Sequence, residues 1–530
     1  MPYFRKILIA NRGEIALRIM RTCRDLGIRT VAVFSDADRE AAHVRQADEA
    51  VRLGPAPAAE SYLAVEKVIG AARRAGADGV HPGYGFLSEN PALPEACRRA
   101  RIAFIGPDAG PMAKLGNKLE ARKLAERAGL HVLPGTSRDV RDAAEIVGCG
   151  RRWGFPLLLK AAAGGGGRGM RVVREAGRAE EELRAARGEA RGAFGDPTVY
   201  VEKYLERPRH VEIQILADRH GGALALGERE CSVQRRHQKL IEESPSPAAS
   251  RAAVQEAGRR AAAICVEAGY AGAATFEFLM DAGGTLTFME VNTRLQVEHP
   301  ITELRFGVDL VEQQIRITAG RRLPAALSRR RPRGAAIEVR INAEDPEQNF
   351  MPATGRVEHL RLPEGPGVRC DSALYAGYQV PLHYDSLLAK IITWGENRAR
   401  ALGRMRRALA ECVILGLPTT LPFHRWALDD AEFRAGRTST AFVQERWEMR
   451  RRAGTASKKD AGRRSKRRGD PLRLRAVLAA VALEIRQGAR GAALPPPQAA
   501  WKRAFQPAPL RPGGGWSGRS QPPARDGRTS

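Results

Sequence analysis

Short apolar runs alternate with amphipathic segments over the first part of the chain. The runs KILIAN, RTVAVFS, DGVHPG and AFIGP predict strands, whereas residues 13–26 and 61–75 carry apolar positions at helical spacing and predict helices. Strands that alternate with helices in this order form a parallel sheet with helices on both faces. The pattern therefore predicts an α/β domain at the N-terminus.

The middle of the chain changes to a richer strand content. Residues 112–129 predict one helix that ends at Gly129, and residues 250–268 predict another. Predicted strands lie between and after them, namely GFPLLLKA, MRVV, VYVEKYL and HVEIQILAD, followed by a hairpin of TFEFLM and LTFMEVN. A Pro- and Arg-rich break, LSRRRPRG, precedes a mixed C-terminal portion that contains AIEVRINAED, GRVEHLRL and LLAKIITW. The chain is long enough for two to four domains of this α/β kind.

The end of the chain differs in composition. From Arg450 to Ser530 it has 20 Lys or Arg residues and four Asp or Glu residues, so most of the net charge of +27 lies there. Residues 471–487 predict one helix, and the remainder has the composition of a disordered tail. Because the basic excess is concentrated in this tail, nucleic-acid binding by the body of the protein is not expected. The basic tail nevertheless leaves one alternative to an enzyme: a scaffold or nucleic-acid-binding protein whose body resembles an enzyme but is inactive.

Membrane and redox signals are lacking in the sequence. No apolar run reaches the roughly 18 residues of a membrane span, and Ile7–Ala10 is too short for the core of a signal peptide. The seven cysteines are spread out with no C-x-x-C pair, which favours reduced thiols over disulfides or a zinc site. We therefore expect a cytoplasmic protein with no membrane contact.

A glycine run joins two predicted strands in LLLKAAAGGGGRGMRVV, at Gly164, Gly165, Gly166 and Gly167. Glycines let main-chain N–H groups close around phosphate oxygens. The P-loop pattern is missing, and a strand rather than a helix follows, so this is not a Rossmann fingerprint either. We interpret the run as a flap over a triphosphate, with Lys160 placed to meet a phosphate; a surface hairpin is the alternative.

An acidic hairpin predicts a metal site. If Gly283–Gly284 forms a two-residue turn, Glu277 lies directly opposite Glu290, and Asn292 is on the same face. Like charges opposed across a ladder destabilise it, and a divalent cation between them reverses that effect. These oxygen ligands suit Mg²⁺. An exposed acidic face is the alternative, but the flanking Phe and Met residues are too apolar for a solvated strand.

The segment TRLQVEHP carries groups that handle a small anion. Arg294 is a planar donor for an oxyanion, and Glu298 is a carboxylate placed to accept a proton, while His299 is equally compatible with a structural role. QRRHQK supplies His237 and Lys239, either as phosphate-facing cations or as part of a solvated basic loop.

Two further segments carry less information by themselves. The strand VEKYL has a main chain that can meet an adenine edge, although core packing explains such a strand as well. In VRINAED, Arg340 lies between apolar residues, which requires an anionic partner.

Taken together, these segments resemble the biotin carboxylase family. GGGGRGM, the acidic hairpin and RLQVEHP are similar to the ATP-grasp fold, and IANRGEIALR, HPGYGFLSEN, QRRHQK and RINAEDP are similar to biotin carboxylase in particular. The resemblance runs from Arg5 to Trp447. It implies four parts: an N-terminal Rossmann-like domain (1–112), an ATP-grasp domain (113–330) with a flexible lid at 131–205, a C-terminal mixed α/β domain (331–447) and the basic tail (448–530).

The resemblance also implies a reaction, in which MgATP activates bicarbonate to carboxyphosphate and biotin is then carboxylated. ATP phosphates would contact Lys118 and Lys160 under the glycine flap. The adenine and ribose would contact a second group: Glu202, Lys203, Leu205 and His210. Two Mg²⁺ or Mn²⁺ ions would be bound by Glu277, Glu290 and Asn292.

The remaining roles that the resemblance implies concern bicarbonate and biotin. Phosphate and bicarbonate would face His237 and Lys239, and bicarbonate would be held by Arg294, Gln296 and Val297. Glu298 would remove the bicarbonate proton, and Arg340 would steady the oxygen of deprotonated biotin. Three departures from the family pattern, Ala163, Ala335 and the pair Arg305–Phe306, remove none of these residues.

The expected protein partners follow from the lack of a biotin-attachment sequence and from the family resemblance. Biotin is attached to a lysine between two methionines, and no Met-Lys-Met triplet occurs in these 530 residues. The resemblance therefore implies a separate biotin carboxyl carrier protein, separate carboxyltransferase subunits and a homodimer, as in the first half-reaction of acetyl-CoA carboxylase in fatty acid synthesis. A component of a propionyl-, methylcrotonyl- or pyruvate carboxylase complex and another ATP-grasp ligase are the alternatives. The basic tail either docks partners or is a plain extension.

Overall fold

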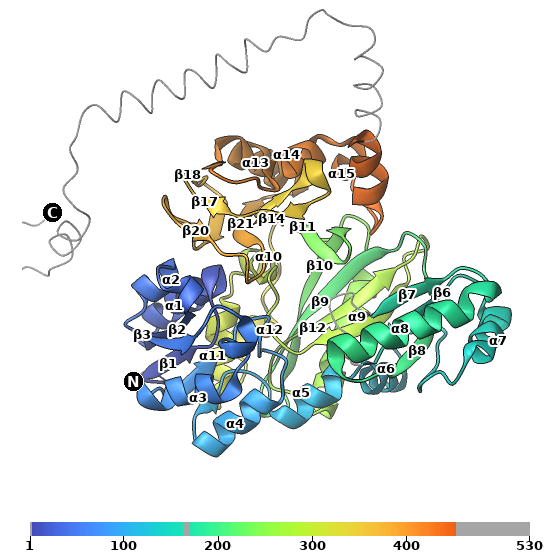
Figure 1. The fold of residues 1–530 in the computed structure, drawn as a ribbon, viewed down its shortest axis with the longest axis horizontal. Coiled ribbons are helices and arrows are strands. Elements are labelled where there is room, and N and C mark those ends of the chain that lie inside the picture. The colour runs from blue at the N-terminus through green and yellow to red at the C-terminus, as the bar shows by residue number, and fades with distance from the viewer. Residues whose placement is uncertain (1–2, 163–168, 452–530) are drawn as a thin grey trace, which may run out of the picture. The chain divides into compact units, whose positions relative to one another are not determined.

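The computed structural model describes residues 3–162 and 169–451. The predicted parallel sheet is present at the N-terminus in the order β3-β2-β1-β4-β5. Figure 1 labels its strands β1, β2 and β3. Its strands are β1 Lys6–Ile9, β2 Arg29–Ser35, β3 Glu49–Gly54, β4 Gly79–His81 and β5 Ala103–Phe104. Its helices are α1 Gly13–Asp25, α2 Ala42–Gln46, α3 Val65–Arg74 and α4 Ala92–Ala100. The predicted helix over residues 61–75 thus begins later, at Val65.

Alternate residues of β1 explain why helices cover both faces of this sheet. Ile7 and Ile9 belong to the core that includes Ile15 and Ile19 of α1, whereas Leu8 belongs to the core formed with α3 and α4. Successive side chains of a strand point to opposite faces, so a fully apolar run is buried on both.

The helix predicted over residues 112–129 is wrong in one respect, because the structure has two helices there. These are α5 Ala109–Gly116 and α6 Lys118–Arg127. Asn117 between them is extended, and its side-chain oxygen accepts hydrogen bonds from the main-chain N–H groups of Leu119 (3.0 Å) and Glu120 (3.1 Å). An asparagine that caps a helix starts a new one, which the apolar spacing alone does not reveal.

A small three-stranded antiparallel sheet has a core of its own. Its order is β7-β6-β8, with β6 Leu157–Ala161, β7 Met170–Val173 and β8 Val199–Lys203. The helices α7 Ala143–Trp153 and α8 Ala179–Phe194 pack on it through a separate buried cluster that includes Leu159 and Val201. Ala163 and the glycines Gly164–Gly167 come between β6 and β7 in the sequence and lie outside the described residues. The predicted helix over residues 471–487 also lies outside the described residues.

The largest element is an eight-stranded antiparallel sheet in the order β13-β12-β9-β10-β11-β14-β21-β19. It runs unbroken across the Pro- and Arg-rich segment, because β11 pairs with β14. Its strands are β9 Arg209–Ala217, β10 Ala223–Arg235, β11 Gln238–Ser244, β12 Gly272–Met280, β13 Leu286–Asn292, β14 Ala335–Asn342, β19 Val368–Ser372 and β21 Leu387–Gly395. One sheet therefore carries side chains from both the middle and the C-terminal portions.

Helices and short strands complete the C-terminal half. The helices are α9 Arg251–Glu267, α10 His299–Phe306, α11 Leu310–Thr318, α12 Ala325–Ser328, α13 Arg398–Glu411, α14 Leu421–Asp429 and α15 Ala431–Arg434. The short strands are β15 Glu344–Asp345, β16 Met351–Pro352, β17 Gly355–Arg356, β18 His359–Arg361, β20 Gln379–Val380 and β22 Val413–Leu415. Within residues 3–162 and 169–451, every helix is too short or too polar to cross a bilayer.

Candidate functional site

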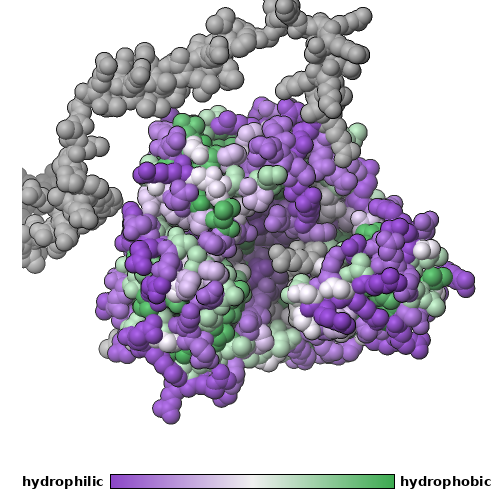
Figure 2. Space-filling view, viewed as in Figure 1, coloured by the Kyte–Doolittle hydropathy of each residue, from purple (hydrophilic) through white to green (hydrophobic). Residues whose placement is uncertain are grey.

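A cavity of about 750 Å³ opens between the N-terminal sheet, the small sheet and the eight-stranded sheet. Figure 2 shows the molecule hollowed near the centre of that view. The predicted site residues that line the cavity are Lys118, Lys160, Glu202, Lys203, Leu205, His210, His237, Lys239, Glu277, Glu290, Asn292, Arg294, Gln296, Val297 and Arg340. Segments far apart in the sequence thus meet at one place, with Glu298 buried directly beside it.

The acidic hairpin has the predicted opposition of carboxylates but not the predicted turn. Glu277 pairs with Glu290, whereas Phe278 pairs with Phe288, so Met289 is an extra residue in β13. The prediction of a two-residue turn is wrong. The main-chain N–H of Asp281 donates a hydrogen bond to the carbonyl of Thr285, so the loop between these two residues has three residues. The bulge at Met289 compensates for the longer loop and restores the opposition.

Basic side chains contact both of these carboxylates. Lys118 Nζ lies 2.6 Å from Glu290 Oε2, and His210 Nε2 lies 3.0 Å from Glu277 Oε2. The amide of Asn292 donates to Glu277 Oε1 at 2.8 Å. Burial raises the pKa of Glu277, but the charges of Lys239 and His210 outweigh it and hold the pKa well below its usual value. The donor set of two carboxylates and an amide oxygen fits a hard divalent cation.

Lys239 is the centre of a buried ion network. Its Nζ lies 2.5 Å from Glu212 Oε2, 2.7 Å from Glu298 Oε1 and 3.1 Å from Glu277 Oε1. Burial lowers the pKa of Lys239, yet the three carboxylates together raise it well above its usual value. The lysine is therefore charged and links the hairpin carboxylates to Glu298.

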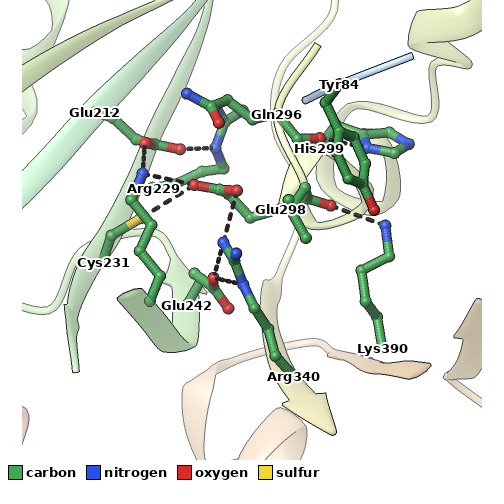
Figure 3. A network of polar contacts seen from close by, with 12 residues as sticks. Tyr84, Glu212, Arg229, Cys231, Glu242, Gln296, Glu298, His299, Arg340 and Lys390 are labelled. Carbon is green, nitrogen blue, oxygen red and sulfur yellow. Dashed lines mark hydrogen bonds and ion pairs between the residues drawn. The ribbon is translucent and has the colours of Figure 1, made fainter. Parts of the chain in front are cut away.

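Glu298 lies between the cations Lys239 and Arg340, and Figure 3 shows its contact with Arg340. Its Oε1 accepts from Lys239, and its Oε2 accepts from Arg340 Nη2 at 2.9 Å. Burial raises the pKa of Glu298, but Lys239, Arg340 and Arg229 lower it well below its usual value. Glu298 is therefore ionised, which is the form that a proton acceptor requires, and it is buried next to Val297, which lines the cavity.

Arg340 satisfies the expectation of an anionic partner with two carboxylates. Its Nε donates to Glu242 Oε1 at 2.5 Å, and its Nη2 reaches Glu298 Oε2 (Figure 3). Burial raises the pKa of Glu242 to about 7, although Arg340 opposes that effect. One edge of the guanidinium is thus occupied by protein carboxylates, and the residue also lines the cavity.

Arg294 lies in a second polar cluster at the cavity wall. Its Nε donates to Glu89 Oε2 at 2.8 Å, and its Nη1 donates to Gln296 Oε1 at 2.8 Å. Its Nη2 is 3.3 Å from Asn292 Oδ1. The arginine therefore connects the hairpin with the segment that carries Gln296 and Val297.

The small sheet supplies another group of predicted residues. Lys160 Nζ bonds to Glu202 Oε2 at 2.9 Å, and Arg122 Nη1 bonds to Glu202 Oε1 at 3.0 Å. Lys203 donates to the carbonyl of Gly154 at 3.0 Å. His237 is exposed at the turn between β10 and β11, in a left-handed conformation with φ 67°.

His299 is buried and bonds within its own segment, with Nδ1 2.7 Å from the carbonyl of Gln296. Burial and the charges of Lys390, Arg18 and Arg369 lower its pKa well below the usual value, so the ring is neutral at physiological pH. This contact favours the structural interpretation of His299.

Sequence reasoning missed four charged residues that complete the network: Glu212, Arg229, Glu242 and Lys390. Arg229 is fully buried, and its Nη1 bonds to Gln214 at 2.7 Å while its Nε bonds to Glu212. Lys390 Nζ donates to the carbonyl of Val297 at 2.8 Å and lies 3.1 Å from Glu14 Oε1. A charged residue inside an apolar strand is the signal for Glu212 in HVEIQILAD and Lys390 in LLAKIITW, whereas Arg229 and Glu242 have charged neighbours in the sequence and do not stand out.

Comparison with known proteins covers most of the chain. Residues 3–112 match the family model described as biotin carboxylase, N-terminal domain, and residues 338–445 match the biotin carboxylase C-terminal domain. Residues 117–326 match the carbamoyl-phosphate synthase L chain, ATP binding domain.

Individual relatives agree with these matches. The chain is 51% identical to a biotin carboxylase of Nostoc sp. over 83% of this chain and 99% of that protein. It is 44% identical to the propionyl-CoA carboxylase alpha chain of Ruegeria pomeroyi, over 84% of this chain and 68% of that protein. Among solved structures, it resembles the biotin carboxylase domain dimer of Hydrogenobacter thermophilus 2-oxoglutarate carboxylase, a structure in complex with MgADP, ADP and bicarbonate. The TM-score is 0.81 and the sequence identity is 42%, and the match covers 83% of this chain and 97% of that one.

Proposed function

Because this chain belongs to the biotin carboxylase family of ATP-dependent ligases, we propose that it uses MgATP to convert bicarbonate to carboxyphosphate and then carboxylates biotin on a carrier protein. The observation that carries this proposal is the position of Glu298, an ionised carboxylate that contacts Lys239 and Arg340, two residues that line the cavity. Such a carboxylate is the base that bicarbonate needs before its oxygen can attack a phosphoryl group.

The nucleotide would occupy the side of the cavity next to the small sheet. Lys118 and Lys160 would contact the phosphates, together with the flap at Gly164–Gly167. The rest of the nucleotide would contact Glu202, Lys203 and Leu205 at the adenine and His210 at the ribose. The support is that the described members of this group line one cavity and that each lysine contacts a carboxylate that also lines it.

Glu277, Glu290 and Asn292 would hold two Mg²⁺ or Mn²⁺ ions. Divalent ions bound there would supply positive charge that offsets the repulsion between the nucleotide and bicarbonate. Lys118 contacts Glu290 and His210 contacts Glu277, so these side chains would have to share or yield their partners when a cation binds.

Bicarbonate would be held by Arg294, Gln296 and Val297, with His237 and Lys239 facing the phosphate. Glu298 would take the bicarbonate proton, the resulting oxyanion would form its bond to the γ-phosphorus, and ADP would leave as the bond from the γ-phosphorus to the β–γ bridging oxygen breaks. Carboxyphosphate would then pass its carboxyl group to biotin: the bond from the carboxyl carbon to the phosphate oxygen breaks, the bond to the biotin nitrogen forms, and the released phosphate takes the proton of that nitrogen.

Arg340 would stabilise the biotin oxygen that gains negative charge when the biotin nitrogen loses its proton. Its guanidinium is fixed by Glu242 and Glu298 and lines the cavity, so it is placed before the acceptor arrives.

The partners in this proposal are a biotin carboxyl carrier protein and carboxyltransferase subunits, with a homodimer as the assembly. The 530 residues contain no Met-Lys-Met triplet for a biotin of their own. Acetyl-CoA or another acyl-CoA in fatty acid synthesis is the acceptor that we favour, with pyruvate, propionyl-CoA or methylcrotonyl-CoA as alternatives.

The proposal is tested with the purified full chain, by following release of ADP with bicarbonate and Mg²⁺, with and without free biotin. We expect ADP release that requires bicarbonate and increases with biotin. If biotin had no effect while a carboxylic acid and an amine supported turnover, the chain would be a different ATP-grasp ligase.

A further inference from the structure

The pairing between β11 and β14 ends just before Arg340. It runs from Ser244 opposite Ala336 to Ile241 opposite Val339. β11 then continues toward the cavity with Lys239, whereas β14 continues with Arg340 and Asn342. The main chain of β14 therefore needs other hydrogen-bond partners on this side, since buried main-chain groups left unpaired are costly.

The start of α14 provides these partners. The main-chain N–H of Thr420 donates to the carbonyl of Asn342 at 3.1 Å, and the N–H of Asn342 donates to Thr420 Oγ1 at 2.9 Å. This reciprocal pair resembles one rung of a ladder, so the residue before α14 takes the place that β11 has left.

The carbonyl of Arg340 accepts two side-chain hydrogen bonds from the same element. Thr420 Oγ1 donates at 3.0 Å, and His424 Nε2 lies at 2.7 Å. A carbonyl oxygen can only accept, so His424 carries its proton on Nε2. The ring is fully buried, and burial lowers the pKa of His424 to about 4, which leaves it neutral with a single N–H.

The second ring nitrogen of His424, Nδ1, does not explain why a histidine is present at this position. Within the part of the chain that the structure describes, His424 Nδ1 has no hydrogen-bond partner. The bond to the Arg340 carbonyl is therefore the polar interaction that accounts for a histidine at this buried position.

We infer that Thr420 and His424 are positioning residues for Arg340, which hold its main chain so that its guanidinium keeps its place against Glu298 and the cavity. The inference rests on the proposed role of Arg340 toward biotin. Pairing of Arg340 with Lys390 fixes the strand from the side of β21, and α14 fixes it from the other side. Neither Thr420 nor His424 lines the cavity, so both act through Arg340.

Simple core packing is the competing explanation for His424, whose ring lies 5.3 Å from that of Phe423. The two explanations differ in what a substitution does. Glutamine can place an amide N–H close to the position of Nε2, whereas leucine fills the space without a donor. If packing alone matters, His424→Leu is tolerated at least as well as His424→Gln.

The experiment compares His424→Leu, His424→Gln, Thr420→Val and Thr420→Ser in the full chain. Two rates are measured for each: carboxylation of free biotin, and bicarbonate-dependent ATP cleavage without biotin. We expect His424→Leu and Thr420→Val to reduce biotin carboxylation about tenfold or more relative to ATP cleavage, and both conservative variants to stay within about threefold of the parent. Leu428→Ala, a buried change in the same helix, is the matched control and should leave the ratio unchanged.

The inference is overturned if His424→Leu and His424→Gln behave alike, or if Leu428→Ala changes the ratio as much as His424→Leu does. Should His424→Leu not fold, Thr420→Val against Thr420→Ser decides by the same ratio. Arg340→Ala is the reference: equal loss of both rates in that variant would refute the proposed role of Arg340 itself, whereas a selective loss there with an unchanged ratio in the His424 and Thr420 variants would refute only the positioning role.

Discussion

Arg340 of β14 lies directly opposite Lys390 of β21, so two cations share one face of the sheet. Like charges in such a pair destabilise a ladder unless each has its own counter-charge. Arg340 is paired with Glu242 and Glu298, whereas Lys390 is paired with Glu14 at 3.1 Å. The two cations thereby connect the N-terminal domain, the segment around Val297 and the C-terminal strands.

Lys390 is the first target for substitution. In Lys390→Met the buried carboxylate of Glu14 loses its cationic partner and keeps only the hydrogen bond from Tyr84, and the carbonyl of Val297 loses its donor. We expect the free energy of unfolding to fall by about 3–5 kcal/mol, measured by urea unfolding. Adding Glu14→Gln should recover part of the loss, while Lys123→Met, which removes an exposed pair with Glu120, should change stability by less than about 1 kcal/mol. A Lys390→Met protein as stable as the parent would contradict this account.

Glu298→Gln keeps the shape of the side chain and removes its charge. The variant cannot accept a proton from bicarbonate, so we expect ATP cleavage to fall by roughly 10²–10⁴-fold. Binding of a fluorescent nucleotide should stay near the parent value, because Glu298 lies beside Lys239 and Arg340 rather than against the small sheet. Glu256→Gln on the exposed face of α9 is the control. Substantial turnover by Glu298→Gln would exclude Glu298 as the base.

The hairpin carboxylates provide a prediction about metal. Glu290→Gln and Glu277→Gln each remove one anionic ligand, so the Mn²⁺ concentration needed for half-maximal ATP cleavage should rise about tenfold or more. Binding of Mn²⁺ in the presence of nucleotide can be followed by electron paramagnetic resonance, independently of turnover. Glu206→Gln, an exposed change beyond β8, serves as control. Unaltered Mn²⁺ binding in both variants would mean that the ions bind elsewhere.

Local patterns were sufficient for much of the fold and less so for its long-range pairing. The parallel N-terminal sheet follows from apolar runs such as that of Ile7 to Ile9, and the acidic hairpin follows from alternation around its turn. The pairing of β11 with β14 joins residues almost a hundred positions apart, and no local signal announces it. The break at Asn117 was missed because a helix cap and a helix interior differ by one side-chain hydrogen bond.

In the candidate site, too, local sequence patterns identify single residues, whereas long-range strand pairing decides which residues contact each other. Glu277, Glu290 and Arg340 stand out in the sequence because charge among apolar residues demands a partner. The identity of each partner, such as Glu242 for Arg340, depends on which strands become neighbours, and that is decided by the whole sheet. The bulge at Met289 shows the converse: the register of the carboxylates was predicted correctly with an incorrect turn.

Glu242 makes stability depend on pH in a defined direction. Burial raises its pKa from 4.5 to about 7 in the folded protein. Between these values the unfolded chain has already lost the proton that the folded chain keeps, so stability falls as pH rises from 4.5 through 7, by up to about 3 kcal/mol. Above pH 7 both forms are ionised and the effect levels off.

The test is the difference in urea midpoint between the parent and Glu242→Gln at pH 5, 6, 7 and 8. The glutamine cannot titrate, so the variant should gain stability relative to the parent as pH rises across this range. Glu256→Gln is the matched control, since the pKa of that exposed carboxyl is lowered by its bonds to Arg259 and Arg260 and it stays ionised throughout. A difference between parent and Glu242→Gln that is constant with pH would show that Glu242 is ionised at pH 5, and that Arg340 then outweighs burial at this position.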